Sequence, residues 1–289
     1  MLIAIHFEEE QHCQQLFQQL REYFKKFSHV GLEASVALDG NETIHLHYHN
    51  KYVSFYDSFH PFVTSVLTDY VIRSKEEEWI LDIIESVFFF HDEEEQQQIL
   101  AIAKSILEGD RDDLPALLPF FDRHEHIYQA FANSLDEETT FYYEPFLTFR
   151  LKSYGEMLID CVEMAIDEYM LEQEYQNMIE SFRQFIQNEQ AKYELIYVVH
   201  DNQKFTFYDS TFRKVTQEEI LFYLEVDLIF EQGLNVEEMV ISPLVSLVPK
   251  KVKVFSDHSD DGVILSLQAI FQERLQVYRL FDFMNEKNI

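Results

Sequence analysis

The sequence is poor in the residues that build turns, phosphate-binding loops and disulfide frameworks. Its 289 residues include only six glycines, six prolines and two cysteines. So few glycines and prolines argue against a turn-rich all-β fold and leave no glycine-rich loop for a phosphate group. Because two cysteines do not form a disulfide framework in a chain of this length, we expect reduced thiols and a cytoplasmic protein.

Positive charge is also scarce. Lys and Arg together number 22 against 53 Asp and Glu, which gives a formal net charge of −31. Duplex nucleic acids and anionic membranes are bound through cationic surfaces, so we expect neither as a partner. The sequence has no uncharged apolar window of about 18 residues and no basic leader, so we expect neither a spanning helix nor a signal peptide.

Several enzyme signatures are absent. The sequence contains no GxSxG, no GxxxxGK[ST], no GxGxxG and no DFG-type triplet. These absences make catalysis less expected without excluding it, and we predict no cofactor. Metals, basic proteins and small molecules stay compatible with the acidic composition.

Apolar residues are plentiful enough for a hydrophobic core. They make up 47% of the chain, with 27 Phe and 16 Tyr. Their spacing divides the chain into a β-α-β-β module over residues 1–57, an all-helical domain over residues 58–190, and an α/β module over residues 191–289. We therefore predict a mixed α+β fold dominated by helices, in which the first and third regions could pack together.

Local signals give the boundaries of several elements. Asp39-Gly40-Asn41 predicts a hairpin between strands over residues 32–39 and 43–49. The longest helical pattern runs from Pro145 to about Gln190, either unbroken or interrupted near Gly155 or Glu172.

The last region is expected to alternate between strands and helices. Strands over residues 193–200 and 204–210 form a second hairpin, and Thr216 with Glu219 forms a capping box that opens a helix to about Gln232. Further elements are a helix capped by Asn235, a strand over residues 251–256, a helix over 260–276 and a strand over 277–283.

Three histidines share one face of a predicted strand. His45, His47 and His49 alternate with the apolar Ile44, Leu46 and Tyr48. Three imidazoles at this spacing could begin a zinc or nickel site. The alternative is an exposed polar face of a sheet without a metal.

A second candidate site lies at the ends of predicted strands. Asp257 and His258 follow the strand over residues 251–256, and Asp209 ends another strand. Ligands of open α/β sheets bind at the carboxyl ends of strands, so these three side chains could hold a divalent cation and catalyse hydrolysis. The alternative is helix capping, with Ser259 as the N-cap and two aspartates beside the helix dipole.

One stretch resembles a known family. Residues 235–249 read NVEEMVISPLVSLVP and are followed by the β run 251–255 and by LSLQAIF at 265–271. This pattern resembles the YtxC-like family, which is associated with sporulation in endospore-forming Firmicutes. The family has no established activity and no agreed catalytic residues, so the resemblance implies a biological context and no site residues.

These observations favour a non-enzymatic accessory or protein-interaction factor that binds a protein partner. A metal-dependent hydrolase or nuclease-like enzyme at the C-terminal module is the alternative. The sequence is also compatible with a homodimer.

Overall fold

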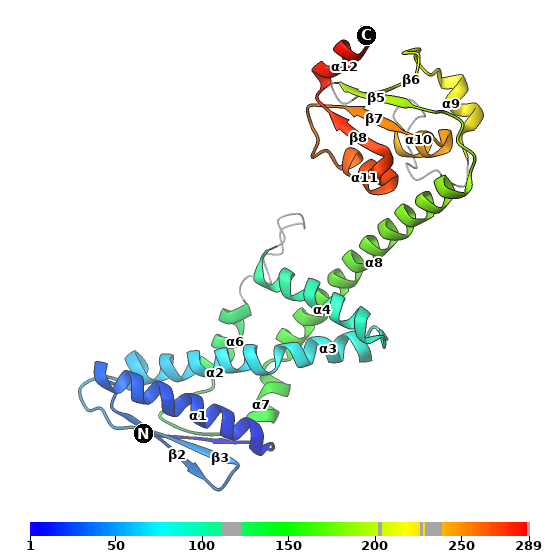
Figure 1. The fold of residues 1–289 in the computed structure, drawn as a ribbon. Coiled ribbons are helices and arrows are strands. Elements are labelled where there is room, and N and C mark those ends of the chain that lie inside the picture. Colours follow the sequence, from blue (N-terminus) through cyan, green and yellow to red (C-terminus); the bar gives the residue numbers. More distant parts are fainter. Residues whose placement is uncertain (111–122, 202–203, 226–227, 229–238, 288–289) are drawn as a thin grey trace. The chain divides into compact units, whose positions relative to one another are not determined.

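The computed structural model describes residues 1–110, 123–201, 204–225, 228 and 239–287 (Figure 1). Contacts between residues divide the chain into two compact units, Met1–Met170 and Leu171–Ile289. The sequence predicted boundaries after residues 57 and 190 instead. Packing of the first 57 residues with the C-terminal module stays a prediction. The mixed, helix-dominated fold class is confirmed.

The first unit contains a four-stranded sheet of order β2-β3-β1-β4. Its strands are β1 (Leu2–His6), β2 (Ala34–Asp39), β3 (Thr43–Tyr48) and β4 (Glu138–Tyr142). β1 is antiparallel to β3, and β2 and β3 form the predicted hairpin. Gly40 lies in its turn at φ +62°, a left-handed conformation that glycine adopts without a steric penalty.

The parallel partner of β1 is β4, which the sequence analysis missed. We expected helices throughout residues 58–190. The correction has a physical reason: Thr139, Thr140, Phe141 and Tyr142 are β-branched or aromatic, and such side chains favour strands. β1 is the neighbouring strand with which these residues form backbone hydrogen bonds.

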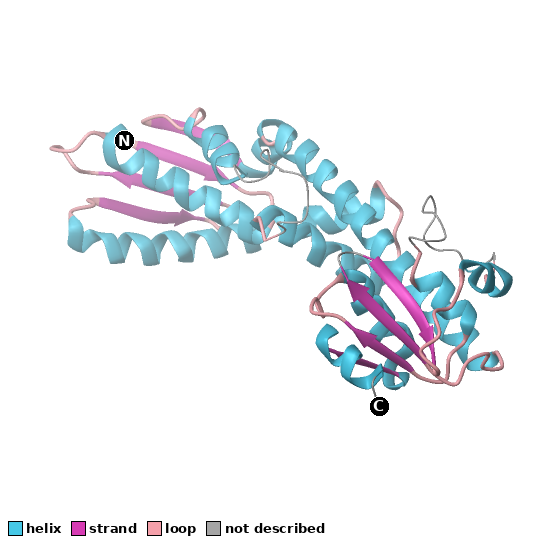
Figure 2. Ribbon diagram, turned by 90° about the horizontal axis from the view of Figure 1, so that it is seen from above, coloured by secondary structure: helices cyan, strands magenta, loops and turns pink. Residues whose placement is uncertain are grey.

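Helices cover one face of this sheet (Figure 2). α1 (Glu10–Phe27) contributes Cys13, Leu16, Leu20 and Phe24 to the core, because their spacing places them on one face of the helix. The other elements of this unit are a short 3₁₀ turn (Ser28–Val30), a π-helical turn (Phe55–Phe59), α2 (His60–Ser74), α3 (Glu76–Ser86), α4 (Glu93–Glu108), α6 (Arg123–Ala132) and α7 (Tyr143–Arg150). The sheet and these helices share a single hydrophobic core.

The longest helix is α8 (Lys152–Asn188). It continues through Gly155 and Glu172, and the break in the predicted segment falls at Leu151, which ends α7. Buried residues of α8 up to Tyr169 belong to the core of the first unit. Ile179, Phe182 and Ile186 belong to the core of the second unit.

The second unit is built on a sheet of order β6-β5-β7-β8. Its strands are β5 (Ile196–Asp201), β6 (Lys204–Asp209), β7 (Val252–Phe255) and β8 (Leu275–Tyr278). β5, β7 and β8 run parallel, and β6 is antiparallel to β5. The helices are α9 (Gln217–Tyr223), α10 (Ile241–Leu247), α11 (Gly262–Phe271) and α12 (Leu280–Lys287), with a 3₁₀ turn at Gln272–Arg274.

Both faces of this second sheet are covered. Val198 and Val254 pack against α10, α11 and the end of α8. Tyr197 and Phe255 pack against Phe283 of α12 on the other face. The parallel strands β5, β7 and β8 therefore lie between two packed layers, and their carboxyl ends meet at one edge of the sheet.

Several boundaries in this unit differ from the prediction, and the helix predicted over 260–276 is α11, which ends at Phe271. The helix capped by Thr216 ends at Tyr223, and the predicted strand over 277–283 is replaced by β8 and the start of α12. Asn235, the predicted cap of the next helix, lies outside the described residues. α10 begins at Ile241, and Pro243 falls in its first turn, where no backbone N–H is needed.

Candidate functional site

The carboxyl ends of β5, β7 and β8 open into a cleft of about 800 Å³. Its lining comprises His200, Asp201, Asp257, His258, Asp260, Asp261 and Leu280. These residues come from the end of β5, the loop from β7 to α11, and the first residue of α12. The cleft therefore lies at the edge of the sheet where open α/β folds bind ligands.

His200 is the most buried polar side chain of this cleft. It is only 5% exposed, and its ring stacks on Phe205 with centroids 4.2 Å apart and an interplanar angle of 1°. Its Nδ1 lies 3.0 Å from the Ser256 hydroxyl, which also accepts a hydrogen bond from the His258 backbone N–H. Nε2 has no hydrogen-bond partner in the described part of the chain. One imidazole nitrogen is thus held by the protein and the other is left for a ligand.

Two of the four aspartates cap helices. Asp257 Oδ1 accepts a hydrogen bond from the Leu280 N–H at the start of α12. Asp261 Oδ1 accepts one from the Val263 N–H and is the N-cap of α11. The predicted capping role for this loop is therefore present, although the N-cap of α11 is Asp261 and not Ser259.

The other two aspartates are available to a ligand. Neither Asp201 nor Asp260 has a side-chain partner among the residues that the structure describes. Among the residues that the structure describes, no Lys or Arg lines the cleft. These two carboxylates have no cation beside them, and they share the cleft with the exposed ring of His258 and the buried ring of His200. Such a site favours a positively charged group.

Asp257 and His258, which the sequence analysis singled out, lie in this cleft, but Asp209 does not. β6 is antiparallel to β5, so Asp209 pairs with Ile196 at the start of β5, whereas Asp201 at the cleft pairs with Lys204. Five residues of strand, about 17 Å, separate the two ends. The structure therefore does not bring Asp209 together with Asp257 and His258.

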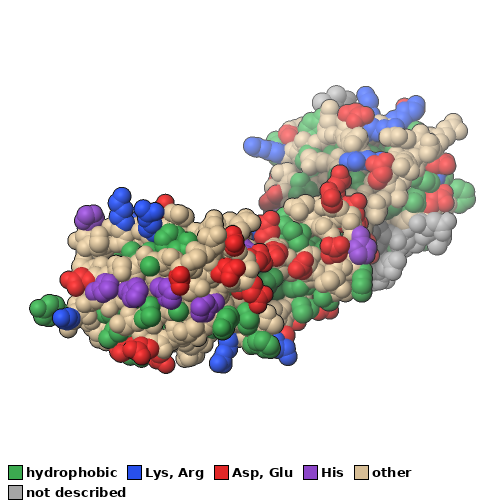
Figure 3. Space-filling model, turned by 90° about the horizontal axis from the view of Figure 1, so that it is seen from below, with side chains coloured by type: hydrophobic (Ala, Val, Ile, Leu, Met, Phe, Trp, Pro, Cys, Tyr) green, Lys and Arg blue, Asp and Glu red, His purple; other side chains and the backbone are tan. Residues whose placement is uncertain are grey.

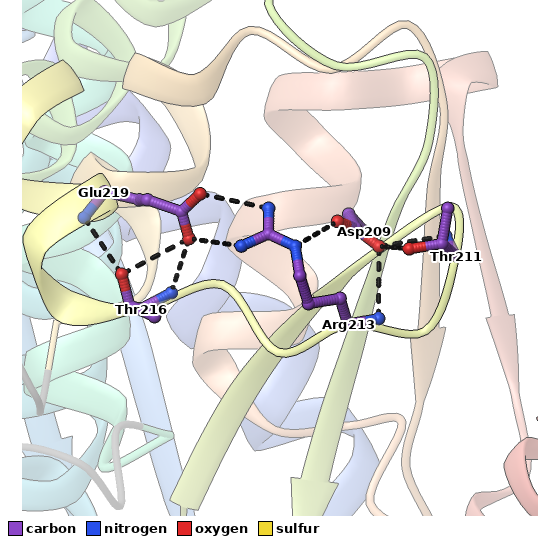
Figure 4. Close-up of polar contacts among 5 residues, drawn as sticks. All are labelled: Asp209, Thr211, Arg213, Thr216 and Glu219. Carbon is purple, nitrogen blue, oxygen red and sulfur yellow. Dashed lines mark hydrogen bonds and ion pairs between the residues drawn. The ribbon is translucent and has the colours of Figure 1, made fainter.

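Asp209 belongs to a separate polar network (Figure 4). Its carboxylate accepts hydrogen bonds from the Thr211 hydroxyl at 2.6 Å and from Arg213 Nε at 3.0 Å, and the same guanidinium donates to both oxygens of Glu219. Burial raises the pKa of Asp209, but the hydrogen bonds from Thr211 and Arg213 outweigh it and hold this pKa below its ordinary value. Glu219 and Thr216 form the predicted capping box of α9. This network fixes the turn after β6.

The histidine face of the first sheet is the other predicted site. His45, His47 and His49 form a row on the open face of β3, with ring centroids 6.5 and 6.0 Å apart (Figure 3). His45 Nε2 lies 3.7 Å from an oxygen of Asp39, and His49 Nε2 lies 2.9 Å from the Ser35 hydroxyl.

The described residues nowhere bring three or more His, Cys, Asp or Glu side chains close enough to hold one metal ion. The three histidines of β3 therefore do not converge on one point. The aspartates and imidazoles of the cleft do not converge either.

The sequence analysis did not identify His200 and Asp201 as site residues. They end a strand that was interpreted only as half of a hairpin. The signal that could have found them is the parallel pairing of β5 with β7, because it brings the residue pair 200–201 beside residues 256–258.

No helix in the described ranges is both long enough and apolar enough to cross a lipid bilayer.

Comparisons with known proteins agree with the resemblance seen in the sequence. The model of the YtxC-like family matches residues 61–276, well over half of the chain. A curated protein of Bacillus subtilis (strain 168), named "Uncharacterized protein YtxC", is 35% identical over 222 residues, which are 77% of this chain and 78% of that protein. No solved structure matches the chain. The chain therefore belongs to the YtxC-like family.

Proposed function

We propose that this protein is a non-enzymatic accessory factor of sporulating cells, and that it binds a basic segment of a partner protein at the cleft of its second unit. The observation that carries the proposal is the lining of the cleft. Its described lining residues include four aspartates and two histidines and no Lys or Arg. The sporulation context comes from the family resemblance.

The geometry favours a cationic side chain as the bound group. Asp201 and Asp260 have no side-chain partner in the described structure, so a Lys or Arg could pair with either without displacing an existing bond. Both carboxylates are exposed, so each ion pair would contribute about 0.2–1 kcal/mol. The apolar wall at Leu280 would contact the aliphatic stem of such a side chain.

The binding test must separate the cleft from the general negative charge of the molecule. We would measure the affinity of a fluorescein-labelled, lysine- and arginine-rich peptide by fluorescence anisotropy. Asp201→Asn combined with Asp260→Asn removes two charges from the cleft. Asp160→Asn combined with Glu163→Gln removes two exposed charges from α8 and is the matched control.

We expect the cleft variant to lose about tenfold in affinity, which corresponds to about 1.4 kcal/mol. The control should lose less than about twofold, because exposed charges far from the ligand are screened by salt. Equal losses in the two variants would show that the peptide is attracted by net charge alone and would contradict the proposal.

A cross-linking pull-down from sporulating cells tests the biological part. A protein recovered with the native chain and lost with the cleft variant supports the proposal. Recovery of no protein, or of the same proteins with both chains, contradicts it.

A metal-dependent hydrolase using the same cleft is the second candidate function. The observation in its favour is that Asp257 and His258 line one cleft with His200 and Asp201. Calorimetric titration with Mn²⁺ and Zn²⁺ distinguishes the two candidates. Stoichiometric metal binding that is abolished by His258→Ala and Asp201→Asn favours the hydrolase, and heat of dilution alone favours the accessory factor.

A further inference from the structure

A second concave surface lies in the first unit, between α3, α7 and the first turns of α8. This groove has a volume of about 620 Å³, within the range of about 300–1,000 Å³ that is usual for ligand sites. Six apolar side chains line it: Trp79, Ile83, Leu147, Leu151, Leu158 and Ile159. It shares no residue with the acidic cleft.

Gly155 keeps the groove open on the side of α8. A Cβ atom built on Gly155 would have no atom of the described residues within 4 Å, apart from its chain neighbours and the backbone of its own helix, so the space beside this position is open. Its backbone φ is not in the left-handed region, so no turn geometry calls for glycine there. Any larger side chain at this position would project into open space at the groove.

The charges around the groove are unbalanced. Lys75 Nζ already pairs with Glu78 at 3.0 Å, and Lys152 Nζ pairs with Glu156 at 3.5 Å. Asp82, an exposed residue at the groove, has no ion-pair partner in the described ranges.

Glu144 adds a second carboxylate. One of its oxygens accepts a hydrogen bond from the Glu8 N–H, and the other is buried and has no hydrogen-bond partner among the described residues. The groove lysines are therefore neutralised while Asp82 and Glu144 are not.

We propose that this groove binds an amphipathic helix of a partner protein, whose apolar face packs on Trp79 and Leu151 and whose Lys or Arg side chains face the exposed Asp82, with the buried charge of Glu144 adding to the negative potential of the groove. Apolar grooves between helices accept partner helices through side chains spaced at i, i+3, i+4 and i+7. The excess of carboxylates selects a basic helix over an acidic one.

The chain contains a natural fluorescent reporter of binding at the groove. Trp79 is its only tryptophan and lines the groove, so a bound helix changes the environment of the single indole. We would titrate the full chain with three synthetic peptides of about 20 residues. One is an amphipathic Leu/Lys helix, one is a Leu/Glu helix with the same apolar face, and one is a scrambled Leu/Lys peptide of the same composition.

The Leu/Lys helix should shift Trp79 emission to shorter wavelength and bind at least about tenfold more tightly than the other two peptides. Gly155→Leu fills the groove and should weaken binding by about tenfold or more. Gly155→Ala makes the same change in helix propensity without filling the groove, so it is the matched control and should stay within about threefold of the native chain.

Two further variants test charge and location. Asp82→Asn should weaken binding of the Leu/Lys helix by about two- to fivefold, the range of exposed ion pairs. Phe222→Ser removes an 80% exposed aromatic side chain from the second unit and should change nothing. The Asp201→Asn, Asp260→Asn variant of the acidic cleft should also bind normally, so this inference and the proposed function can fail independently.

Four results would overturn the proposal. The scrambled peptide could bind as well as the amphipathic one, or Gly155→Leu could bind as well as Gly155→Ala. An apolar dye could occupy the groove without being displaced by the peptide, which would indicate a small-molecule site. Sedimentation could show a dimer that Gly155→Leu dissociates, which would identify a second copy of this chain as the occupant.

Discussion

Replacing Arg123 by Met should destabilise the first unit in a pH-dependent way. Glu76 at the start of α3 is buried, with only 9% of its side chain exposed. Its carboxylate lies 3.2 Å from Arg123 Nη1 on α6 and accepts a hydrogen bond from the hydroxyl of the fully buried Tyr154 on α8. These contacts join three helices around one negative charge, and Arg123 supplies the positive charge that pairs with it.

The expected loss follows from the burial of that charge. Removing one partner of a buried ion pair typically costs about 3–5 kcal/mol, because the remaining charge is left without compensation. The Arg123 side chain is 20% exposed, and the Tyr154 hydroxyl still donates to Glu76 in the variant. We therefore expect a loss of about 2–3 kcal/mol at neutral pH in the free energy of unfolding.

The sign of the pH dependence is set by Glu76. Burial raises its pKa above the ordinary value of 4.5, and Tyr154 and Arg123 partly oppose that rise. A carboxyl group with a raised pKa contributes most stability below its unfolded pKa, and the contribution is lost as pH rises through the folded pKa. Without Arg123 the pKa rises further, so the variant should be most destabilised at high pH.

Urea unfolding followed by Trp79 fluorescence measures this unit alone, because Trp79 is the only tryptophan and lies in α3. The difference between native chain and variant should be larger at about pH 8 than at about pH 4, which is below the ordinary pKa of 4.5. Adding Glu76→Gln should restore at least half of the loss, since a neutral amide needs no cation. An equal loss at both pH values, with no recovery in the double variant, would refute the reasoning and indicate lost packing of the arginine stem.

Three further predictions concern single side chains. Thr216→Ala removes the side chain that accepts a hydrogen bond from the Glu219 N–H, and it should cost about 1 kcal/mol and speed hydrogen exchange of residues 217–223 about fivefold. Gly155→Ala should raise the free energy of unfolding of the first unit by about 0.5–1 kcal/mol in the same urea titration, because alanine favours the helix and its Cβ meets no atom. Burial raises the pKa of Cys13 to about 11 and that of Cys161 to about 12, so a thiol reagent near pH 8 should label neither in the native chain and both in urea.

Elements with a local signal could be predicted from the sequence. The hairpin at Gly40 and the capping box at Thr216 each depend on a few neighbouring residues, and both are present. β4 has no comparable local signal, since it begins in an acidic run and its partner β1 lies far away in sequence. Its strand character depends on tertiary pairing, which periodicity does not reveal.

The candidate site could be predicted only in part, for a related reason. Asp257 and His258 follow a strand of obvious pattern, so the strand-end rule found them. The same rule misplaced Asp209, because it is valid for parallel strands and β6 runs the opposite way. The predicted hairpin already implied this reversal, and applying it would have moved Asp209 to the far edge of the sheet.

The pairing of β1 with β4 has a consequence for biosynthesis. About 90 residues separate the end of β3 from the start of β4, so at about 5–20 residues per second the ribosome needs roughly 5–18 s to deliver the missing strand. Throughout that interval the nascent chain exposes the hydrogen-bonding edge of β1, which is a template for pairing with other chains. Truncation before residue 138 makes this exposure permanent, so such fragments should be insoluble unless a chaperone shields them.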